Sequence, residues 1–176
     1  TVAGTGTAGF SGDGGPATSA NLNGPYGLAV DRAGNIIFVD GFNHCVRRVD
    51  AGTGVITTVA GNRNPSFGGD GGPATAAGLY YPVGISLLPD GSILIADSGN
   101  KRIREVTPNG TIFTIAGNGN PYGGLGDGQL ATNAYLSTPV DVVADAQGNF
   151  FIADEGTCRI RRVDAATQII TTVAGN

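Results

Sequence analysis

Short apolar runs recur along the chain in sets of four, separated by turn residues. In the first set the runs cover residues 26–30, 36–39, 45–49 and 55–59. They are rich in β-branched residues and are bounded by Gly, Asn and Asp, which is the pattern of short β-strands. The following sets open at residues 85–88 and 140–144. The pattern therefore predicts an all-β chain built from units of four antiparallel strands.

A repeated tetrapeptide shows that these sets are copies of one unit. Thr1–Gly4 recurs as Thr58–Gly61, Thr114–Gly117 and Thr172–Gly175. Units of this length that each hold four strands are typical of β-propeller blades, which must stack to bury both faces. We expect three blades, over residues 5–61, 62–117 and 118–175, with residues 1–4 as the final strand of a preceding blade. Alternate residues of each strand should then pack toward opposite neighbours.

A glycine-rich loop opens every unit, at residues 11–18, 69–75 and 126–132. Pro16 and the alanines that follow this loop favour a single helical turn. We expect the long loops after each fourth strand to carry the contact with a partner.

Composition excludes several classes of function. The formal net charge is −4, which argues against a nucleic-acid binder because such proteins need a basic face for phosphates. No apolar run is long enough to cross a bilayer. The two cysteines, Cys45 and Cys158, lack metal-site spacing and are expected to be small buried or half-buried residues. The chain starts inside the repeated motif without Met, so we expect a processed chain or part of a longer one.

Several motifs resemble one family. Asn43–Arg47 resembles the Asn-His-Leu signature of NHL repeats, and Pro25–Asp31 followed by Gly34-Asn35 also fits that family. The Gly-Asp-Gly-Gly-Pro-Ala-Thr loop resembles the long-repeat form of bacterial NHL proteins and teneurin-type cell-surface proteins. The resemblance implies a ring of six blades, of which this chain supplies half, or a segment of a longer array. Only the first copy keeps the His, and Asp141 stands where the other copies have Gly27 and Gly84.

Acidic and basic residues recur at matching places in each unit. An Asp ends the second strand and an Arg lies on the third, so a hairpin should bring the two together in a charge-assisted hydrogen bond. The expected structural pairs are Asp40 with Arg47, Asp97 with Arg104, and Asp154 with Arg161.

The long loops that contain the glycine-rich segments carry the candidate binding residues, because each loop holds an Asp and an aromatic residue. These candidates are Phe10, Asp13, Phe67, Asp70, Tyr122 and Asp127. A calcium site needs six to eight oxygens, and each loop supplies one carboxylate, so we expect each Asp to cap backbone N–H groups instead. An alternative role for the aromatic residues is packing each loop onto its own blade.

Other sites receive less support. His44 is the only histidine, so a zinc site with about three protein ligands cannot be assembled. No Gly-x-Ser-x-Gly motif accompanies it to indicate a Ser-His-Asp triad, and we expect His44 at the surface or between blades. No cofactor or metal is predicted. Asn109 begins the Asn-Gly-Thr sequon on an expected hairpin tip and is a glycosylation candidate.

These features favour a non-catalytic module for binding or scaffolding, in an extracellular or cell-surface assembly. Its partner would be a protein, through self-association of blades or neighbouring repeats, or a glycan; nucleic acid and membrane insertion are not expected. Two alternatives stay open. One is a building block of a fibre, assembled as a homo-oligomer or polymer, and the other is a lyase or hydrolase with Tyr26 and Asp141 at a central channel.

Overall fold

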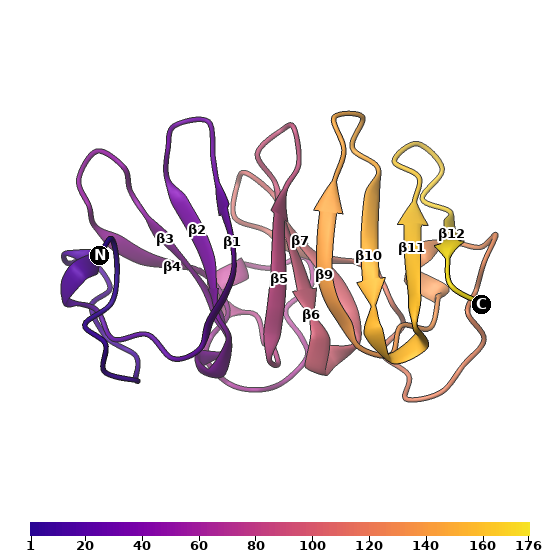
Figure 1. Cartoon of the computed structure of the whole chain (residues 1–176), viewed down its shortest axis with the longest axis horizontal. Helices are drawn as coiled ribbons and strands as arrows, with labels where there is room; N and C mark the ends of the chain where they lie inside the picture. The colour runs from indigo at the N-terminus through magenta and orange to yellow at the C-terminus, as the bar shows by residue number, and fades with distance from the viewer.

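The computed structural model describes residues 1–176 and consists of three antiparallel sheets of four strands each (Figure 1). The strands of each sheet are paired in chain order. The first sheet holds β1 (Pro25–Val30), β2 (Ile36–Asp40), β3 (Cys45–Val49) and β4 (Ile56–Ala60). The second holds β5 (Pro82–Leu87), β6 (Ile93–Asp97), β7 (Arg102–Val106) and β8 (Ile112–Ala116). The third holds β9 (Pro139–Ala144), β10 (Phe150–Asp154), β11 (Arg159–Val163) and β12 (Ile170–Ala174). The prediction of four-stranded propeller blades is confirmed.

The first strands of the three sheets lie next to one another, and the sheets fan out from them (Figure 1). Two glycines allow this close approach. A Cβ on Gly27 would lie 2.8 Å from the carbonyl oxygen of Val83, and a Cβ on Gly84 would lie 2.5 Å from the Cα of Asp141. Such distances are shorter than van der Waals contact, so β1, β5 and β9 can stack this way only because positions 27 and 84 lack side chains.

The core consists of two layers of apolar side chains between the sheets and a smaller third cluster, Ala17, Ala20, Phe38, Val49 and Ile56, in the first unit. Ile95 belongs to the cluster between the first and second sheets, whereas the adjacent Leu94 belongs to the cluster between the second and third. Successive side chains on a strand point to opposite faces, so β6 fills both layers. The expectation that alternate residues face opposite neighbours is confirmed.

Short 3₁₀ turns connect the elements. Three follow the glycine-rich loops: η1 (Ala17–Ser19), η3 (Ala74–Ala76) and η5 (Ala131–Asn133). The other three follow the second strands: η2 (Gly41–Asn43), η4 (Ser98–Asn100) and η6 (Glu155–Thr157). Pro16 directly precedes η1, as expected for a turn that begins after Pro.

The two cysteines differ in environment. Cys45 is fully buried at the start of β3, whereas Cys158 is exposed. The expectation for Cys158 is wrong, because this residue ends η6 with φ 54° and precedes β11 rather than lying on it. A left-handed residue at a turn end points outward, and no further sheet covers it.

Residues 1–4 form no strand in this structure. They nevertheless lie where the end of a preceding sheet would lie. The N–H of Gly4 donates to the carbonyl of Ala17 at 3.0 Å, just as Gly61 donates to Ala74 at 2.9 Å. None of the short helical turns has the length to cross a membrane.

We expect Gly84→Ala to lower the free energy of unfolding by about 1–3 kcal/mol, because overpacking at a tight contact forces the backbone apart. Gly124→Ala is the matched control, since a Cβ there meets nothing within 4 Å. Urea unfolding of both variants checks this. Equal midpoints for the two variants would contradict the close approach of β5 and β9.

Candidate functional site

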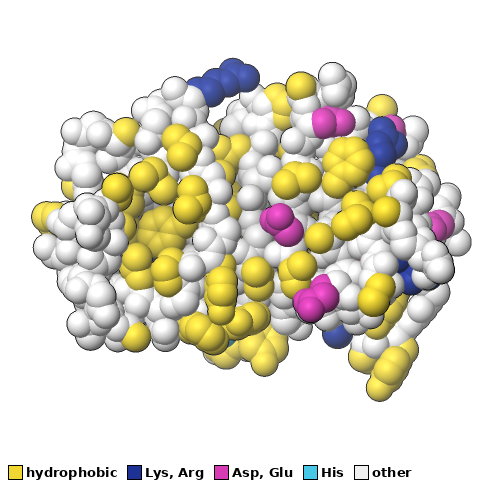
Figure 2. Space-filling view, in the orientation of Figure 1, with side chains coloured by type: hydrophobic (Ala, Val, Ile, Leu, Met, Phe, Trp, Pro, Cys, Tyr) yellow, Lys and Arg dark blue, Asp and Glu magenta, His cyan; other side chains and the backbone are white.

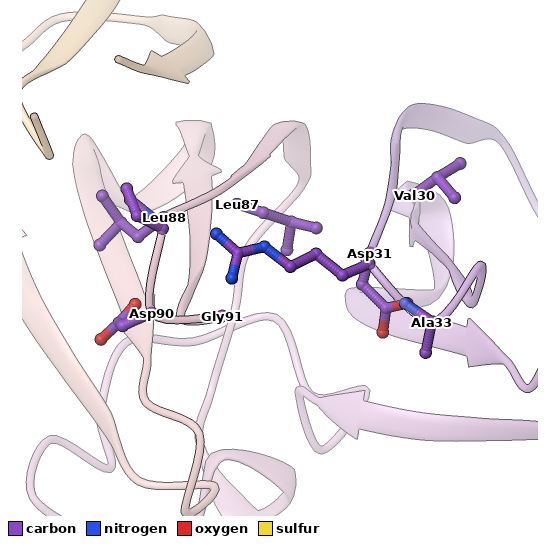
Figure 3. Close-up of a pocket in the computed structure, with 9 residues that line it drawn as sticks. Val30, Asp31, Ala33, Leu87, Leu88, Asp90 and Gly91 are labelled. Carbon is purple, nitrogen blue, oxygen red and sulfur yellow. The ribbon is translucent and has the colours of Figure 1, made fainter. Parts of the chain in front are cut away.

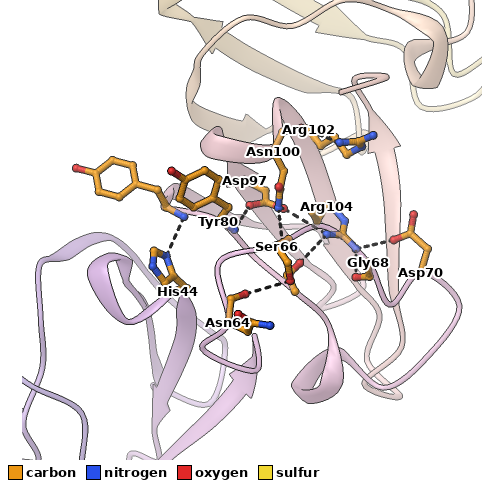
Figure 4. Close-up of polar contacts among 12 residues, drawn as sticks. His44, Asn64, Ser66, Gly68, Asp70, Tyr80, Asp97, Asn100, Arg102 and Arg104 are labelled. Carbon is orange, nitrogen blue, oxygen red and sulfur yellow. Dashed lines mark hydrogen bonds and ion pairs between the residues drawn. The ribbon is translucent and has the colours of Figure 1, made fainter. Parts of the chain in front are cut away.

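A buried arginine organises the loop end of each sheet, and Figure 4 shows the example in the second sheet. The guanidinium of Arg104 is fully buried and donates to Asp97 at 3.2 Å and to Asp70 at 2.6 Å. It also donates to the carbonyl of Gly68 at 3.2 Å. Asp97 ends β6, whereas Asp70 lies in the glycine-rich loop. The arginine therefore fastens that loop to the sheet.

The first sheet repeats this arrangement, and the third departs from it. Arg47 donates to Asp40 at 3.3 Å and to Asp13 at 2.8 Å. Arg161 donates to Asp127 at 2.7 Å.

The expected pair of Asp154 with Arg161 is absent, because the carboxylate of Asp154 is taken by other donors. It accepts from the N–H groups of Ser137 and Thr138 and from the hydroxyl of Thr157. In the other two units, Asn43 and Asn100 stand at the place of Thr157 and donate to the corresponding Asp.

The loop carboxylates do not cap backbone N–H groups in the way the sequence suggested. Asp13, for example, accepts from Arg47 and, at 2.7 Å, from the hydroxyl of Thr58. Asp13 binds the arginine instead of backbone N–H groups because a charge-assisted hydrogen bond to a buried guanidinium is stronger than a hydrogen bond to a backbone amide of the turn. Asp13 and Arg47 are 34 residues apart, so no local spacing could have indicated the contact. No three potential metal-ligating side chains lie together in the structure.

The loop aromatics fall into two groups. Phe10 lies under Arg47, with the guanidinium carbon 4.5 Å from the ring centre, and Phe67 lies under Arg102 at 3.7 Å. These contacts are cation–π interactions that hold the loop in place. Tyr122 is different, because it is 86% exposed.

Burial affects the carboxylates unequally. Burial raises the pKa of Asp97 to about 6, although hydrogen bonds from Asn100 and Tyr80 and the charge of Arg104 act to lower it. Because the raised pKa favours the neutral carboxyl in the folded chain, the contribution of Asp97 to the free energy of unfolding is full below pH 4. It is lost as the pH rises from near 4 toward 6. Asp127 shows the opposite sign: burial acts to raise its pKa, but the hydrogen bond and the charge of Arg161 act to lower it, and the pKa falls below its ordinary value. Its contribution is present above pH 4 and is lost as the pH falls.

A second group of aromatic side chains lies at the junction of the first two sheets. The rings of Tyr26, Phe42 and Tyr81 have centroids 5.4–6.0 Å apart, and the hydroxyls of Tyr26 and Tyr81 are 2.9 Å apart. Tyr80 lies beside His44, with ring centroids 5.8 Å apart. We call Tyr26, Phe42, Tyr80 and Tyr81 the aromatic patch. Tyr26 is 39%, Phe42 51% and Tyr80 46% exposed.

His44 lies between the first two blades, as expected. Its Nδ1 accepts the backbone N–H of Tyr81 at 3.1 Å, and Figure 4 shows it beside Tyr80. This bond connects the turn after β2 to the start of β5. The imidazole therefore supports the aromatic patch through the backbone of Tyr81 and an edge contact with the ring of Tyr80, and it has no acid or nucleophile as a partner.

The repeat itself does not require the aromatic patch. At the second junction the places of Tyr26, Phe42 and Tyr81 are taken by Val83, Gly99 and Thr138. The fold tolerates these small or polar residues, so packing alone does not explain the aromatic side chains. Sequence reasoning missed the patch, although the Tyr80-Tyr81 pair before Pro82 was a usable signal.

The remaining acidic residues and the proposed channel residues do not form a common site. An open cleft of about 390 Å³ lies between the first hairpins of the first two sheets, and Asp31 and Asp90 line it (Figure 3). Both carboxylates accept bonds within their own turns. Asp141, a candidate for a channel together with Tyr26, is exposed on β9 and accepts the N–H of Val142. Tyr26 bonds instead to Tyr81.

The glycosylation candidate lies in the turn between β7 and β8. Asn109 is exposed there, and its side-chain oxygen accepts the N–H of Thr111 at 3.2 Å. Glycosylation at this residue stays a prediction.

Comparison with known proteins agrees with the three-sheet geometry. A model of the teneurin NHL domain matches residues 6–67, and a model of the NHL repeat matches residues 79–105. The chain belongs to the NHL-repeat family. It is 31% identical to mouse Teneurin-1 over 169 residues, which cover 89% of this chain and 6% of that protein. The chain thus spans a small part of this relative.

Solved structures show the same fold. A protein of unknown function from Bacteroides thetaiotaomicron superposes with a TM-score of 0.69 and 22% identity, over 82% of this NHL chain and 36% of the other. Virginiamycin B lyase from Staphylococcus aureus superposes with a TM-score of 0.55 and 18% identity, over 86% and 41%. At such identities the likeness concerns the fold alone.

We expect Arg104→Leu to destabilise the chain by about 3–5 kcal/mol, because it leaves the carboxylate of Asp97 buried without its charged partner. Arg32→Leu is the control, since Arg32 is exposed and should change stability little. Thermal unfolding checks both variants. An unchanged melting temperature for Arg104→Leu would rule out a structural role for the arginine.

We expect Cys158 to react with a maleimide in the folded chain and Cys45 to react only after unfolding. Burial raises the pKa of Cys45 to about 12, so its thiolate is scarcely populated at neutral pH. Peptide mapping by mass spectrometry, in dilute protein with and without urea, identifies the labelled residue. Equal labelling rates in the folded chain would contradict the burial of Cys45.

Proposed function

We propose that this chain is a non-catalytic propeller module that binds a protein partner through the aromatic patch, in an extracellular or cell-surface assembly. The observation that carries the proposal is the patch itself. Three of its side chains are between 39% and 51% exposed. The equivalent positions at the second junction hold smaller residues. Exposed large apolar side chains that the fold does not need are typical of interaction surfaces.

The construction of the patch suits recognition. Tyr26 lies on β1 and Tyr81 directly precedes β5, so both start from rigid inner strands. The bond between their hydroxyls and the bond from Tyr81 to His44 hold the rings before a partner arrives. Tyrosine offers a large contact area at low cost in conformational entropy, which favours tight binding.

Chemistry favours a protein over a glycan as the partner. The patch consists of three tyrosines and a phenylalanine, with no charged side chain among them. Cores of protein interfaces are enriched in aromatic residues and depleted of charge. The similarity to Teneurin-1 supports a place in a cell-surface assembly.

In this proposal most of the candidate residues in the glycine-rich loops hold the loops in place and do not bind the partner. Asp13, Asp70 and Asp127 hold arginines and so serve the loop structure. Tyr122 is the loop side chain that is free to meet a partner, because it is 86% exposed.

We expect Phe42→Ala and Tyr80→Ala each to weaken partner binding at least about tenfold, because central aromatic residues of an interface carry most of its binding energy. The probes are a panel of immobilised cell-surface protein ectodomains and a glycan array, read with fluorescently labelled chain. Both residues are about half exposed, so melting temperatures should stay near that of the unmodified chain.

Phe113→Ala is the matched control, because Phe113 is 42% exposed and lies on β8, outside the aromatic patch. It should bind an ectodomain like the unmodified chain. Binding that survives both patch substitutions, or binding to glycans alone, would overturn a protein contact at this surface.

A further inference from the structure

The aromatic patch offers hydrogen-bond donors to a ligand. The hydroxyls of Tyr26 and Tyr81 lie 2.9 Å apart, so one donates to the other and the second O–H of the pair has no partner in the chain. Tyr80 is 46% exposed and adds a further hydroxyl, which Figure 4 shows without a contact. The Nδ1 of His44 accepts the N–H of Tyr81, and burial lowers the pKa of the imidazole, so His44 is neutral and carries its proton on Nε2.

The backbone carbonyls beside the patch are already occupied. The carbonyl of Gly24 accepts the N–H of Gly41 at 3.0 Å. The carbonyl of Tyr80 accepts the N–H of Gly99 at 2.8 Å. The surface therefore favours a ligand that brings carbonyl acceptors and few N–H donors.

Tyr81 is held in a strained backbone conformation. Its φ is 49°, in the left-handed region, although it directly precedes Pro82 and a residue before proline prefers an extended backbone. In the first unit the same place is taken by Gly24, whose φ is 64°. A bulky residue with positive φ is costly, and such strain is concentrated at functional sites. The ring of Tyr81 is therefore present despite a cost to the fold, which glycine would avoid.

We propose that the aromatic patch binds a proline-rich segment in the polyproline II conformation. This inference rests on the proposed function, because it names the kind of protein segment that the patch takes. Proline has no backbone N–H to satisfy, and a polyproline II helix keeps its carbonyls free of internal hydrogen bonds. Aromatic surfaces bind such segments well because the conformation is formed beforehand and loses little entropy.

The spacing and tilt of the rings fit this ligand. The centroids of Tyr26, Phe42 and Tyr81 are 5.4–6.0 Å apart, and a polyproline II helix advances about 6 Å over two residues. The rings are inclined to one another by 56–67°, so they present separate faces to successive proline rings. Figure 2 shows hydrophobic side chains gathered at the lower edge of the molecule, where β5 begins.

A fluorescein-labelled decamer of L-proline is the probe, and fluorescence anisotropy with the full chain measures its binding. We expect saturable binding at submillimolar concentration. The matched control is a decamer of D-proline, which has the same composition but winds in the opposite sense. It should bind at least about tenfold more weakly, because the surface is complementary to one hand only. Equal binding of the two decamers would mean unspecific adsorption and would overturn the proposal.

Tyr81→Gly separates recognition from stability. It should weaken binding of the L-proline decamer at least about tenfold, because it removes a ring from the centre of the surface. The melting temperature should stay close to that of the unmodified chain, since glycine adopts this φ without strain and so offsets the lost ring contacts. Phe113→Ala is the control and should bind normally. Unchanged binding with a lower melting temperature would show a structural ring and would overturn its role in recognition.

Tyr80→Phe tests the donors, because it keeps the ring and removes one O–H. We expect severalfold weaker binding of the L-proline decamer, through loss of a hydrogen bond to a proline carbonyl. Unchanged affinity would overturn the contact between donor and carbonyl on which the choice of proline rests.

Competition distinguishes this inference from the proposed function. The supporting result is an ectodomain that binds the chain, loses binding with Phe42→Ala, and is displaced by the L-proline decamer. An ectodomain that depends on Phe42 but is not displaced, with no binding of the decamer, supports the proposed function and overturns the proline-rich ligand. Failure of both the ectodomain panel and the decamer to bind would overturn both.

Discussion

A four-stranded sheet with apolar side chains on both faces cannot keep both faces dry by itself, and this constraint governs the whole molecule. The second sheet meets it by packing between two neighbours, so that Leu94 and Ile95 on adjacent positions of β6 are both fully buried. The first and third sheets each have one neighbouring sheet, and the outer face of the first is partly covered where Phe38, Val49 and Ile56 are buried with Ala17 and Ala20. The stability of each blade therefore depends on its neighbours, as in other repeat proteins.

The buried arginines solve a second problem, which is how to hold a long glycine-rich loop in one conformation. Glycine lowers the cost of tight turns but leaves the loop with much entropy to lose. Arg104 offsets this by joining Asp70 of the loop to Asp97 of the sheet, with Phe67 stacked nearby. Asp70 and Phe67, which looked like binding residues in the sequence, are thus part of the loop's own structure.

The proposed function rests on positions where the units differ, because the shared positions are explained by the fold. Tyr80 and Tyr81 replace the Ser137 and Thr138 of the third unit, and they build a patch that the second junction lacks. A repeat protein can change one unit in this way without disturbing the others, since each blade contacts only its neighbours.

The sequence by itself determined the class of fold and the unit of repetition. The strands were readable because each is a short apolar run closed by turn residues, and the stacking was readable because both faces of β6 are apolar. Local spacing also placed Asp40 and Arg47 on one hairpin. The tertiary structure alone decided three matters: the bond of Asp13 to Arg47, the grouping of the aromatic patch, and the exposure of Cys158 and Leu28. Each of these joins residues far apart in the chain or depends on whether another sheet lies alongside, and no local pattern records how neighbouring blades meet.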